Sequence, residues 1–383
     1  VVALEQSTKR ADIIRARYRE YDNLTVISDD IFKAKFEEQF DYIILAGVLE
    51  YAAMNGDSSS YSKLLQRIKE LLKINGKLLL AIENRFGLKY WCGAAEDHTA
   101  VPYDGISGYE GNGFTTRYES SGVRTFSKND LQEMLMAEGF KETRWYYPLP
   151  DYKFPSAVFS DEKLPTINDI KAIKWTYPLE SELVADEKKL YEEIIANRCF
   201  PFFSNSFLIE VGLNQLDEYH IKYACYKRDY KEEYRITTIL DSEGNYIKKA
   251  NSENAKKHLL ESKKNLDNLS VMVATLETKK KGDTLVSPEE VSISGALRLK
   301  NCLENGNFGE VISIIRILKL NIEKSSEIDY EINKKNTIEK VLNIKEGTLA
   351  MGPILKKGYI DMNFNNCFWI DNELVFFDQE WVI

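Results

Sequence analysis

The residues best suited to chemistry lie between residues 83 and 126, in a stretch without clear helical or strand periodicity. His98 follows the acids Glu96 and Asp97. An imidazole beside a carboxylate can take up a proton near neutral pH, so we predict His98 as a general base that Asp97 supports. The alternative is a structural histidine in a surface loop, and the spacing alone leaves both open.

The same stretch carries groups that can hold a polar, ring-shaped substrate. Asn84, Arg85 and Arg124 offer hydrogen-bond donors for sugar or carboxylate oxygens. Tyr90 and Trp91 offer flat faces on which a sugar ring can stack. Roughly 40 aperiodic residues are long for a connection in a compact domain, which predicts a lid or substrate loop. Salt bridges and core packing would explain the same residues equally well.

Around this stretch, strands and helices alternate along the chain. Apolar strand patterns occupy residues 1–5, 24–27, 40–48, 77–82, 142–146 and 156–160, and helical patterns occupy 7–21, 60–72 and 127–139. Asn75 and Gly76 are expected to end the second helix. This alternation predicts an α/β domain over residues 1–160 with a doubly wound, Rossmann-like, mostly parallel sheet.

In such a sheet the ligand lies across the carboxyl ends of the strands. Glu5 ends the first strand, Asp30 follows the second, and Gly47 lies in the turn after the third. A carboxylate there can accept hydrogen bonds from both hydroxyls of a ribose, and a backbone turn can contact an adenine edge. The alternative is that these acids cap the helices that follow.

Taken in order, these residues resemble the class I S-adenosylmethionine-dependent methyltransferases. The resemblance implies that Glu5 binds the ribose, that Asp30 and Ile31 bracket the adenine, and that Ala46 and Gly47 form the cofactor-facing turn. It implies S-adenosylmethionine as the cofactor and no metal in this domain. In that family a GxGxG loop precedes the ribose acid by about twenty residues, upstream of Val1. We therefore expect a domain that starts after this loop, and weak or no cofactor binding.

The strings ENRFGLKYW, EDH and GVRTFS resemble methyltransferases of bacterial cell-surface polysaccharide assembly. This narrower resemblance implies O-methylation of a sugar or glycan intermediate, with polysaccharide-assembly enzymes as partners. The alternative is a non-catalytic scaffold, or a phosphotransferase module, in the same assembly.

Residues 161–195 are predicted to be a connector, and residues 196–383 a second, α+β domain. Lys248 lies on an expected strand and Glu261 on the helix after it, while Asp361 precedes Asn366 by five residues and Asp378 follows. This order resembles a protein-kinase-like domain, C-terminally truncated, as in bifunctional O-antigen chain-terminating methyltransferase-kinases. The resemblance implies Mg-ATP, with Mg²⁺ at Asn366 and Asp378.

Several positions depart from the kinase pattern. Tyr359 replaces the usual histidine, and Gln379 with Glu380 replaces Phe-Gly. No convincing glycine-rich loop precedes the strands. These departures put phosphotransfer in doubt, and an Asx-rich turn before a hairpin is the alternative explanation of the Asp-to-Asn spacing.

The composition excludes several classes of protein. The 383 residues carry a formal net charge of −9, with lysine clusters interleaved with acids, so we expect no nucleic-acid partner. No apolar run approaches the roughly 20 residues that span a bilayer, which predicts no transmembrane segment. The five cysteines are scattered and form no CxxC pair. This usage is typical of a reducing compartment and predicts a cytoplasmic protein.

Overall fold

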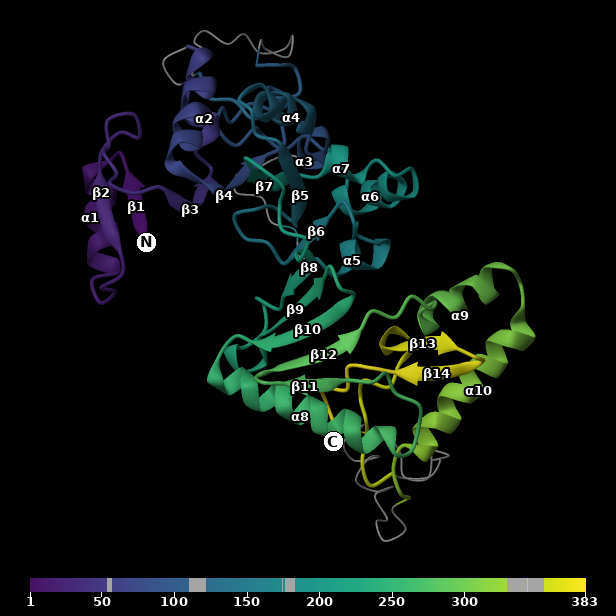
Figure 1. The fold of residues 1–383 in the computed structure, drawn as a ribbon. Helices are drawn as coiled ribbons and strands as arrows, with labels where there is room; N and C mark the ends of the chain where they lie inside the picture. Colours follow the sequence, from purple (N-terminus) through teal and green to yellow (C-terminus); the bar gives the residue numbers. More distant parts are fainter. Residues whose placement is uncertain (54–56, 110–121, 174, 176–182, 329–342, 344–354) are drawn as a thin grey trace. The chain divides into compact units, whose positions relative to one another are not determined.

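The chain folds into two compact units, Val1–Ala224 and Cys225–Ile383. The structure, a computed structural model, describes residues 1–53, 57–109, 122–173, 175, 183–328, 343 and 355–383 (Figure 1). The sequence pattern placed the boundary earlier, at residues 161–195. The difference comes from β7 (Ser206–Gly212), which the pattern assigned to the second domain but which pairs with two strands of the first unit.

The larger sheet of the first unit has the order β6-β5-β7-β4-β3. Its strands are β3 (Phe40–Ala46), β4 (Leu72–Glu83), β5 (Glu142–Leu149), β6 (Ala157–Ser160) and β7. β3 and β4 are parallel, whereas the β4–β7, β5–β7 and β5–β6 pairs are antiparallel. The sheet is therefore mixed, and the prediction of a mostly parallel sheet is corrected. β7 is the cause, because it enters antiparallel between β4 and β5.

A smaller, parallel sheet is formed by β1 (Val2–Glu5) and β2 (Thr25–Ser28). Between them lies α1 (Thr8–Arg17), whose N-cap Ser7 accepts a hydrogen bond from the Arg10 backbone N–H. The two strands and the start of the helix agree with the predicted ranges to within one residue, since the N-cap serine and the two apolar runs are strong local signals. The helix ends at Arg17, four residues before its predicted end.

One face of α2 (Ser59–Leu71) packs into the core through Leu64, Leu65 and Ile68. The helical spacing predicted this face and the end of the helix to within one residue, but the role predicted for Asn75 and Gly76 was wrong. β4 begins at Leu72 and continues through Gly76. A Cβ at Gly76 would lie 2.8 Å from the Phe40 carbonyl oxygen. The glycine therefore allows close approach to β3 and does not end the helix.

The remaining helices of the first unit are short. They are α3 (Leu88–Trp91), α4 (Lys128–Ala137), α5 (Ile167–Ala172), α6 (Glu187–Ala196), α7 (Phe200–Phe203) and the 3-10 turn at Leu49–Tyr51. Aromatic side chains such as Tyr147, Tyr191 and Phe207 are fully buried between these helices and the sheet.

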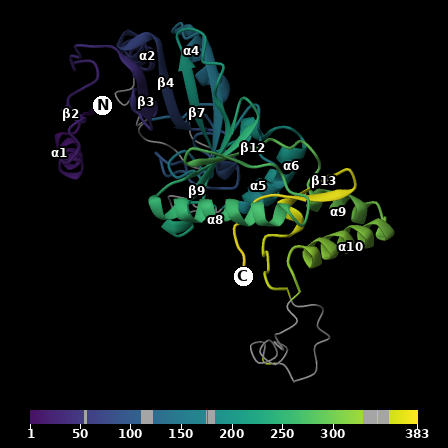
Figure 2. The ribbon, with the colours of Figure 1, turned by 60° about the horizontal axis from the view of Figure 1, so that its bottom comes forward.

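The second unit contains an antiparallel sheet with the order β11-β12-β10-β9. Its strands are β9 (Ile236–Asp241), β10 (Asn245–Ala250), β11 (Lys279–Lys281) and β12 (Thr284–Pro288), and β8 (Ile221–Tyr226) crosses the division between the units. The unit also holds α8 (Glu253–Ser270), α9 (Gly295–Glu304), α10 (Phe308–Lys324), the hairpin β13 (Cys367–Ile370) and β14 (Glu373–Phe376), and 3-10 turns at Glu232–Tyr234 and Phe364–Asn366. Figure 2 shows α9 and α10 beside this hairpin. Among the described residues, none of the helices has the length and apolar character needed to cross a membrane.

The start of α4 offers a stability test. Ser127 and Asp130 form a capping box, in which each side chain accepts the other residue's backbone N–H. We expect Ser127→Ala to lower the free energy of unfolding by about 1 kcal/mol, because one N–H of the first turn loses its acceptor. Chemical denaturation measures the change, with Ser127→Thr as the control that keeps the hydroxyl. An alanine variant as stable as the parent would contradict this role.

Candidate active site

Three strand ends of the first unit meet at one edge of the larger sheet. Glu83 is the last residue of β4, Glu50 lies in the turn after β3, and Lys153 follows β5. Because β4 and β5 are both antiparallel to β7, they run in the same direction. The carboxyl ends of β3, β4 and β5 therefore share an edge, which is where a doubly wound sheet binds its ligand.

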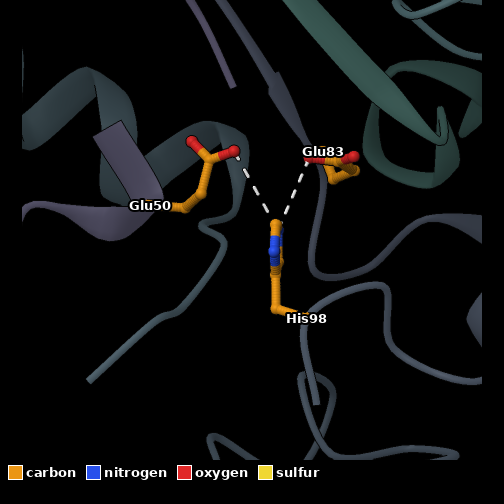
Figure 3. A group of neighbouring side chains, drawn as sticks. All are labelled: Glu50, Glu83 and His98. Atoms are coloured by element: carbon orange, nitrogen blue, oxygen red, sulfur yellow. Dashed lines mark ion pairs between the residues drawn. The ribbon is translucent and has the colours of Figure 1, made fainter. Parts of the chain in front are cut away.

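His98 projects between two buried carboxylates at this edge (Figure 3). Its Nε2 atom lies 3.8 Å from Oε2 of Glu83 and 4.0 Å from Oε1 of Glu50. Its Nδ1 atom lies 3.1 Å from the Tyr51 hydroxyl oxygen. Both glutamates are 1% exposed and the His98 side chain is 8% exposed. The structure thus brings the histidine singled out in the sequence to the sheet edge, together with acids from two strand ends.

Burial and neighbouring charges shift the pKa values of the two glutamates in opposite directions. Burial raises the pKa of Glu50 to about 7, and the neighbouring Glu83 adds to the rise. Burial alone would also raise the pKa of Glu83, but His98 and Lys153 outweigh it and hold that pKa below its usual range. Burial would lower the pKa of His98, whereas Glu83, Glu96 and Glu50 together raise it. Glu83 therefore carries charge, while Glu50 is the carboxyl that can be neutral near pH 7.

The acids beside His98 in the sequence have other partners. The Asp97 carboxylate lies 3.0 Å from the Lys89 Nζ atom and 3.4 Å from that of Lys153. Glu96 accepts the backbone N–H of His98 at 2.8 Å, so it fixes the loop that carries the imidazole. The carboxylates that face the imidazole are Glu83 and Glu50, and not the predicted Asp97.

Two of the predicted substrate residues shape the chain after β4. The Asn84 amide donates to the carbonyls of Phe202 and Ser204, each at 2.7 Å, and its oxygen accepts the N–H of Phe86. The Asn84 side chain is buried and fully bonded, so it holds the backbone in place. Arg85 lies over the Phe86 ring, with its guanidinium 4.5 Å from the ring centroid.

The other three predicted substrate residues differ in their burial and in their contacts. Tyr90 is buried, and its hydroxyl has no hydrogen-bond partner among the described residues. Arg124 donates its backbone N–H to the Glu50 carbonyl at 3.2 Å, and its guanidinium lies over the Tyr109 ring. Trp91 is exposed and packs on Phe203. Tyr90 and Arg124 therefore remain the better candidates for contact with a substrate.

The predicted cofactor residues divide between the two sheets. Glu5 accepts the Ser7 N–H at 2.8 Å, and Asp30 accepts a hydrogen bond from the Gln6 amide at 3.3 Å, so Gln6 joins the ends of β1 and β2. Ile31 packs against the core of the unit.

Ala46 and Gly47 lie at the end of β3. Ala46 is exposed, and Gly47 has a φ of 65°, a conformation that favours glycine. A Cβ on Gly47 would lie 2.7 Å from the Tyr152 hydroxyl oxygen. The turn that leads to Glu50 therefore requires a glycine, both for its backbone angle and for the close approach of Tyr152.

Sequence reasoning missed Glu83, Lys153 and Lys89 as members of the site. Glu83 had a readable signal, because it closes the apolar run of β4 in the way that Glu5 closes β1. Lys153 pairs with the other oxygen of Glu83, Oε1. Nothing in the spacing of the sequence connects Lys153 to Glu83, since the contact depends on β7 holding β4 and β5 together.

In the second unit, four of the five predicted kinase-like residues contact one another in two pairs, and the fifth does not. Lys248 on β10 forms an ion pair with Asp378. Asn366 donates its amide to the Asp361 carbonyl at 3.1 Å. Glu261 is exposed on α8, and the partner found for it is Lys264, at 3.6 Å. The structure thus places Asp378, and not Glu261, against Lys248.

A cavity of about 230 Å³ lies beside the ion pair of the second unit. Apolar side chains form much of its wall, including Leu266, Leu285, Phe368 and Phe377. Lys248 and Asp378 also line it. The cavity therefore combines an apolar wall with a charged end.

No model of a protein family matches the chain, and no curated protein matches it. Solved structures with some likeness to it include S-adenosylmethionine-dependent methyltransferases. One is the N-methyltransferase NodS from Bradyrhizobium japonicum with S-adenosyl-L-homocysteine, 18% identical over 24% of this chain and 44% of that one, with a TM-score of 0.21. The chain therefore spans less than half of that protein.

The likeness to two further structures extends over a larger share of both chains. A possible histamine N-methyltransferase from Thermotoga maritima is 16% identical over 56% of this chain and 72% of that one, with a TM-score of 0.31. The mycolic acid cyclopropane synthase CmaA1 is 19% identical over 55% and 68%, with a TM-score of 0.30. Likenesses this low carry no argument about activity, which has to come from the site itself.

Removing the Lys153 ammonium tests how far Glu83 depends on it. We expect Lys153→Met to lower the free energy of unfolding by about 2 kcal/mol, because the buried carboxylate loses its closest cation. The loss is smaller than for a fully buried pair, since the Lys153 side chain is 35% exposed. Urea denaturation at pH 7 measures it, with Lys153→Arg as the charge-retaining control. A methionine variant of unchanged stability would show that Lys89 and His98 suffice.

Proposed function

We propose that the first unit is an S-adenosylmethionine-dependent O-methyltransferase that acts on a hydroxyl of a sugar or glycan. The observation that carries the proposal is the cluster of His98, Glu50 and Glu83 at the carboxyl edge of the sheet. A buried histidine between two carboxylates, at the edge where such sheets bind ligands, is suited to receiving the proton of an acceptor hydroxyl.

The residues at the strand ends fit a nucleotide-like cofactor. Gly47 lies at the edge of the sheet and has no side chain to cover its backbone, and Ala46 beside it is exposed. Glu5 and Asp30 place carboxylates at the ends of β1 and β2. When bound, S-adenosylmethionine supplies an electrophilic methyl group on a sulfonium. This chain's part is then to align the acceptor oxygen and to take up its proton, and Tyr90 and Arg124 are the proposed contacts to the acceptor.

The setting of this activity is part of the proposal. A sugar or glycan acceptor fits the hydrogen-bonding side chains around the cluster, and it would place the protein in the cytoplasm beside enzymes of polysaccharide assembly. The alternative of a non-catalytic scaffold makes a different prediction, namely that the complete natural protein binds no S-adenosylmethionine in calorimetry.

His98 is the residue whose removal tests the proposed chemistry. We expect His98→Ala to slow methyl transfer by roughly 10²-fold or more, because the acceptor hydroxyl loses the group that receives its proton. Affinity for S-adenosylmethionine should stay unchanged, since the contacts proposed for the cofactor are Glu5, Asp30, Ile31, Ala46 and Gly47, and His98 is not among them. Radiolabelled methyl transfer by the complete natural protein to a panel of saccharides measures the rate, and calorimetry measures the affinity.

The control is His220→Ala, which removes a histidine paired with Glu162 at another place in the unit. Its rate should match that of the parent protein. An unaltered rate of methyl transfer in His98→Ala would show that His98 has a structural role and does not receive the proton.

The second unit supports a second candidate function, phosphotransfer from Mg-ATP. The observation that favours it is the cavity whose charged end is the Lys248–Asp378 pair. Lys248 would contact a phosphate, and the apolar wall would accept a base. Asp378 and the side-chain oxygen of Asn366 would hold Mg²⁺, which when bound neutralises phosphate charge. Asn366 fits this role because its amide nitrogen already donates to Asp361, which leaves Oδ1 for an ion.

Asp378→Ala separates this candidate from a purely structural ion pair. We expect the parent protein to bind Mg-ATP in calorimetry and the variant to lose most of that binding, since it lacks the carboxylate that would hold the ion. Glu261→Ala is the matched control, because that carboxylate lies on the exposed face of α8. If the parent protein binds no Mg-ATP, phosphotransfer is excluded.

A further inference from the structure

We propose that His98, Glu50 and Glu83 form a binding site for a divalent first-row metal ion. Each residue offers one ligand atom, and these atoms all lie within 4.8 Å of one another. The three side chains come from the turn after β3, the end of β4 and the loop after α3, and they point toward a common centre (Figure 3).

The distances suit ligands of one ion better than hydrogen bonds. Nε2 of His98 lies 3.8 Å from Glu83 and 4.0 Å from Glu50, beyond hydrogen-bond range. Two ligands on opposite sides of an ion with bonds of about 2.1 Å lie about 4.2 Å apart. Both distances from Nε2 fall within that span, and any spacing of the ligand atoms nearer 4.8 Å would have to shorten as the ion binds. The imidazole is therefore too far from either carboxylate to donate a proton well, yet near enough to share a cation with both.

The atoms that face the centre lack other partners. Both carboxylate oxygens of Glu50 and the Nε2 atom of His98 are buried and accept or donate no hydrogen bond among the described residues. Buried polar atoms without partners are rare, because each costs about 1–3 kcal/mol in lost solvation. An ion at the centre would satisfy all of them at once.

The surrounding groups hold the ligands as outer contacts of a metal site usually do. The Tyr51 hydroxyl lies 3.1 Å from Nδ1 of His98, so a proton on Nδ1 leaves the lone pair of Nε2 directed at the carboxylates. Lys153 pairs with Oε1 of Glu83, whereas Oε2 is the oxygen that faces His98. Lys153 can therefore stay in place and orient Glu83 while the ion binds.

The local charge also leaves room for a cation. Around His98 lie four carboxylates, with two ammonium groups to balance them. The carboxylates belong to Glu50, Glu83, Glu96 and Asp97, and the ammonium groups to Lys89 and Lys153. The carboxylates therefore outnumber the ammonium groups by two, so a cation at the centre would lie in acidic surroundings.

The ligand set selects the class of ion. One imidazole nitrogen with two carboxylates suits Zn²⁺ or Mn²⁺, whereas Mg²⁺ and Ca²⁺ favour oxygen ligands alone. Three protein ligands leave at least one coordination position for a water or a substrate oxygen. Binding of the ion needs neither a cofactor nor an acceptor, so its test is independent of the proposed methyl transfer. If both hold, His98 would serve as a ligand, and an ion held by His98, Glu50 and Glu83 would make the acceptor hydroxyl more acidic, with its proton passing to water.

The experiment is a titration of the chelator-treated chain with ZnCl₂ and, separately, with MnCl₂. We expect saturable binding of one ion per chain by calorimetry, and a rise in melting temperature on addition of the ion. For Mn²⁺, the loss of the free-ion signal in electron paramagnetic resonance counts the bound ions directly. No saturable binding of either ion up to millimolar concentration would overturn the site.

Two variants locate the ion. His98→Ala and Glu50→Gln should each weaken binding by more than about 100-fold, since each removes a ligand. Glu50→Gln is the safer of the two for folding, because it keeps the shape of the side chain and removes a buried charge. Its melting temperature without metal should not fall below that of the parent protein.

The matched control is His220→Ala, in which the histidine of a single histidine–carboxylate pair is removed. It should bind the ion as tightly as the parent protein. If it loses binding while Glu50→Gln keeps it, the ion binds elsewhere on the chain and the proposed site is wrong.

Discussion

The burial of the Glu83 carboxylate at the end of β4 is the constraint on which the edge of the first unit depends. An ionised carboxylate out of contact with water costs several kcal/mol unless cations and donors surround it. Lys153 meets one of its oxygens, and His98 faces the other. The end of β5 and the loop after α3 must therefore converge on β4. That convergence, rather than any single residue, creates the candidate active site.

β7 makes this convergence possible. It lies between β4 and β5 and pairs antiparallel with both, with Ile209 opposite Leu80 on one side and Trp145 on the other. Two antiparallel neighbours on either side of one strand run parallel to each other, so the carboxyl ends of β4 and β5 fall on the same edge. Ile209 and Val211 are fully buried, as expected for a strand covered on both faces. The first unit therefore needs a strand that follows α6 and lies well beyond the predicted boundary.

The sequence predicts the local structure of this arrangement better than it predicts contacts between residues that lie far apart in the chain. The strand runs, the Ser7 and Ser127 caps and the buried face of α2 depend on neighbouring residues, and they were readable. His98 was readable as a candidate because it follows Glu96 and Asp97 in a stretch without helical or strand periodicity. Its partners were not, because Asp97 beside it faces lysines, while Glu50 and Glu83 approach it only after the sheet forms. Place in the sheet, and not adjacency in the sequence, decides which acid meets the imidazole.

Both units bury acidic side chains, but they differ in how completely cationic side chains pair with them. In the second unit, burial would raise the pKa of Asp378, but Lys248 and Lys227 outweigh it and lower that pKa. Lys227 also pairs with Glu380, so each acid in this group has a lysine against it. In the first unit, Lys153 and His98 face Glu83, but both oxygens of Glu50 lack a hydrogen bond and its pKa rises to about 7. A buried carboxyl without a hydrogen bond destabilises the fold, and a proton or a cation is the partner that would offset this cost.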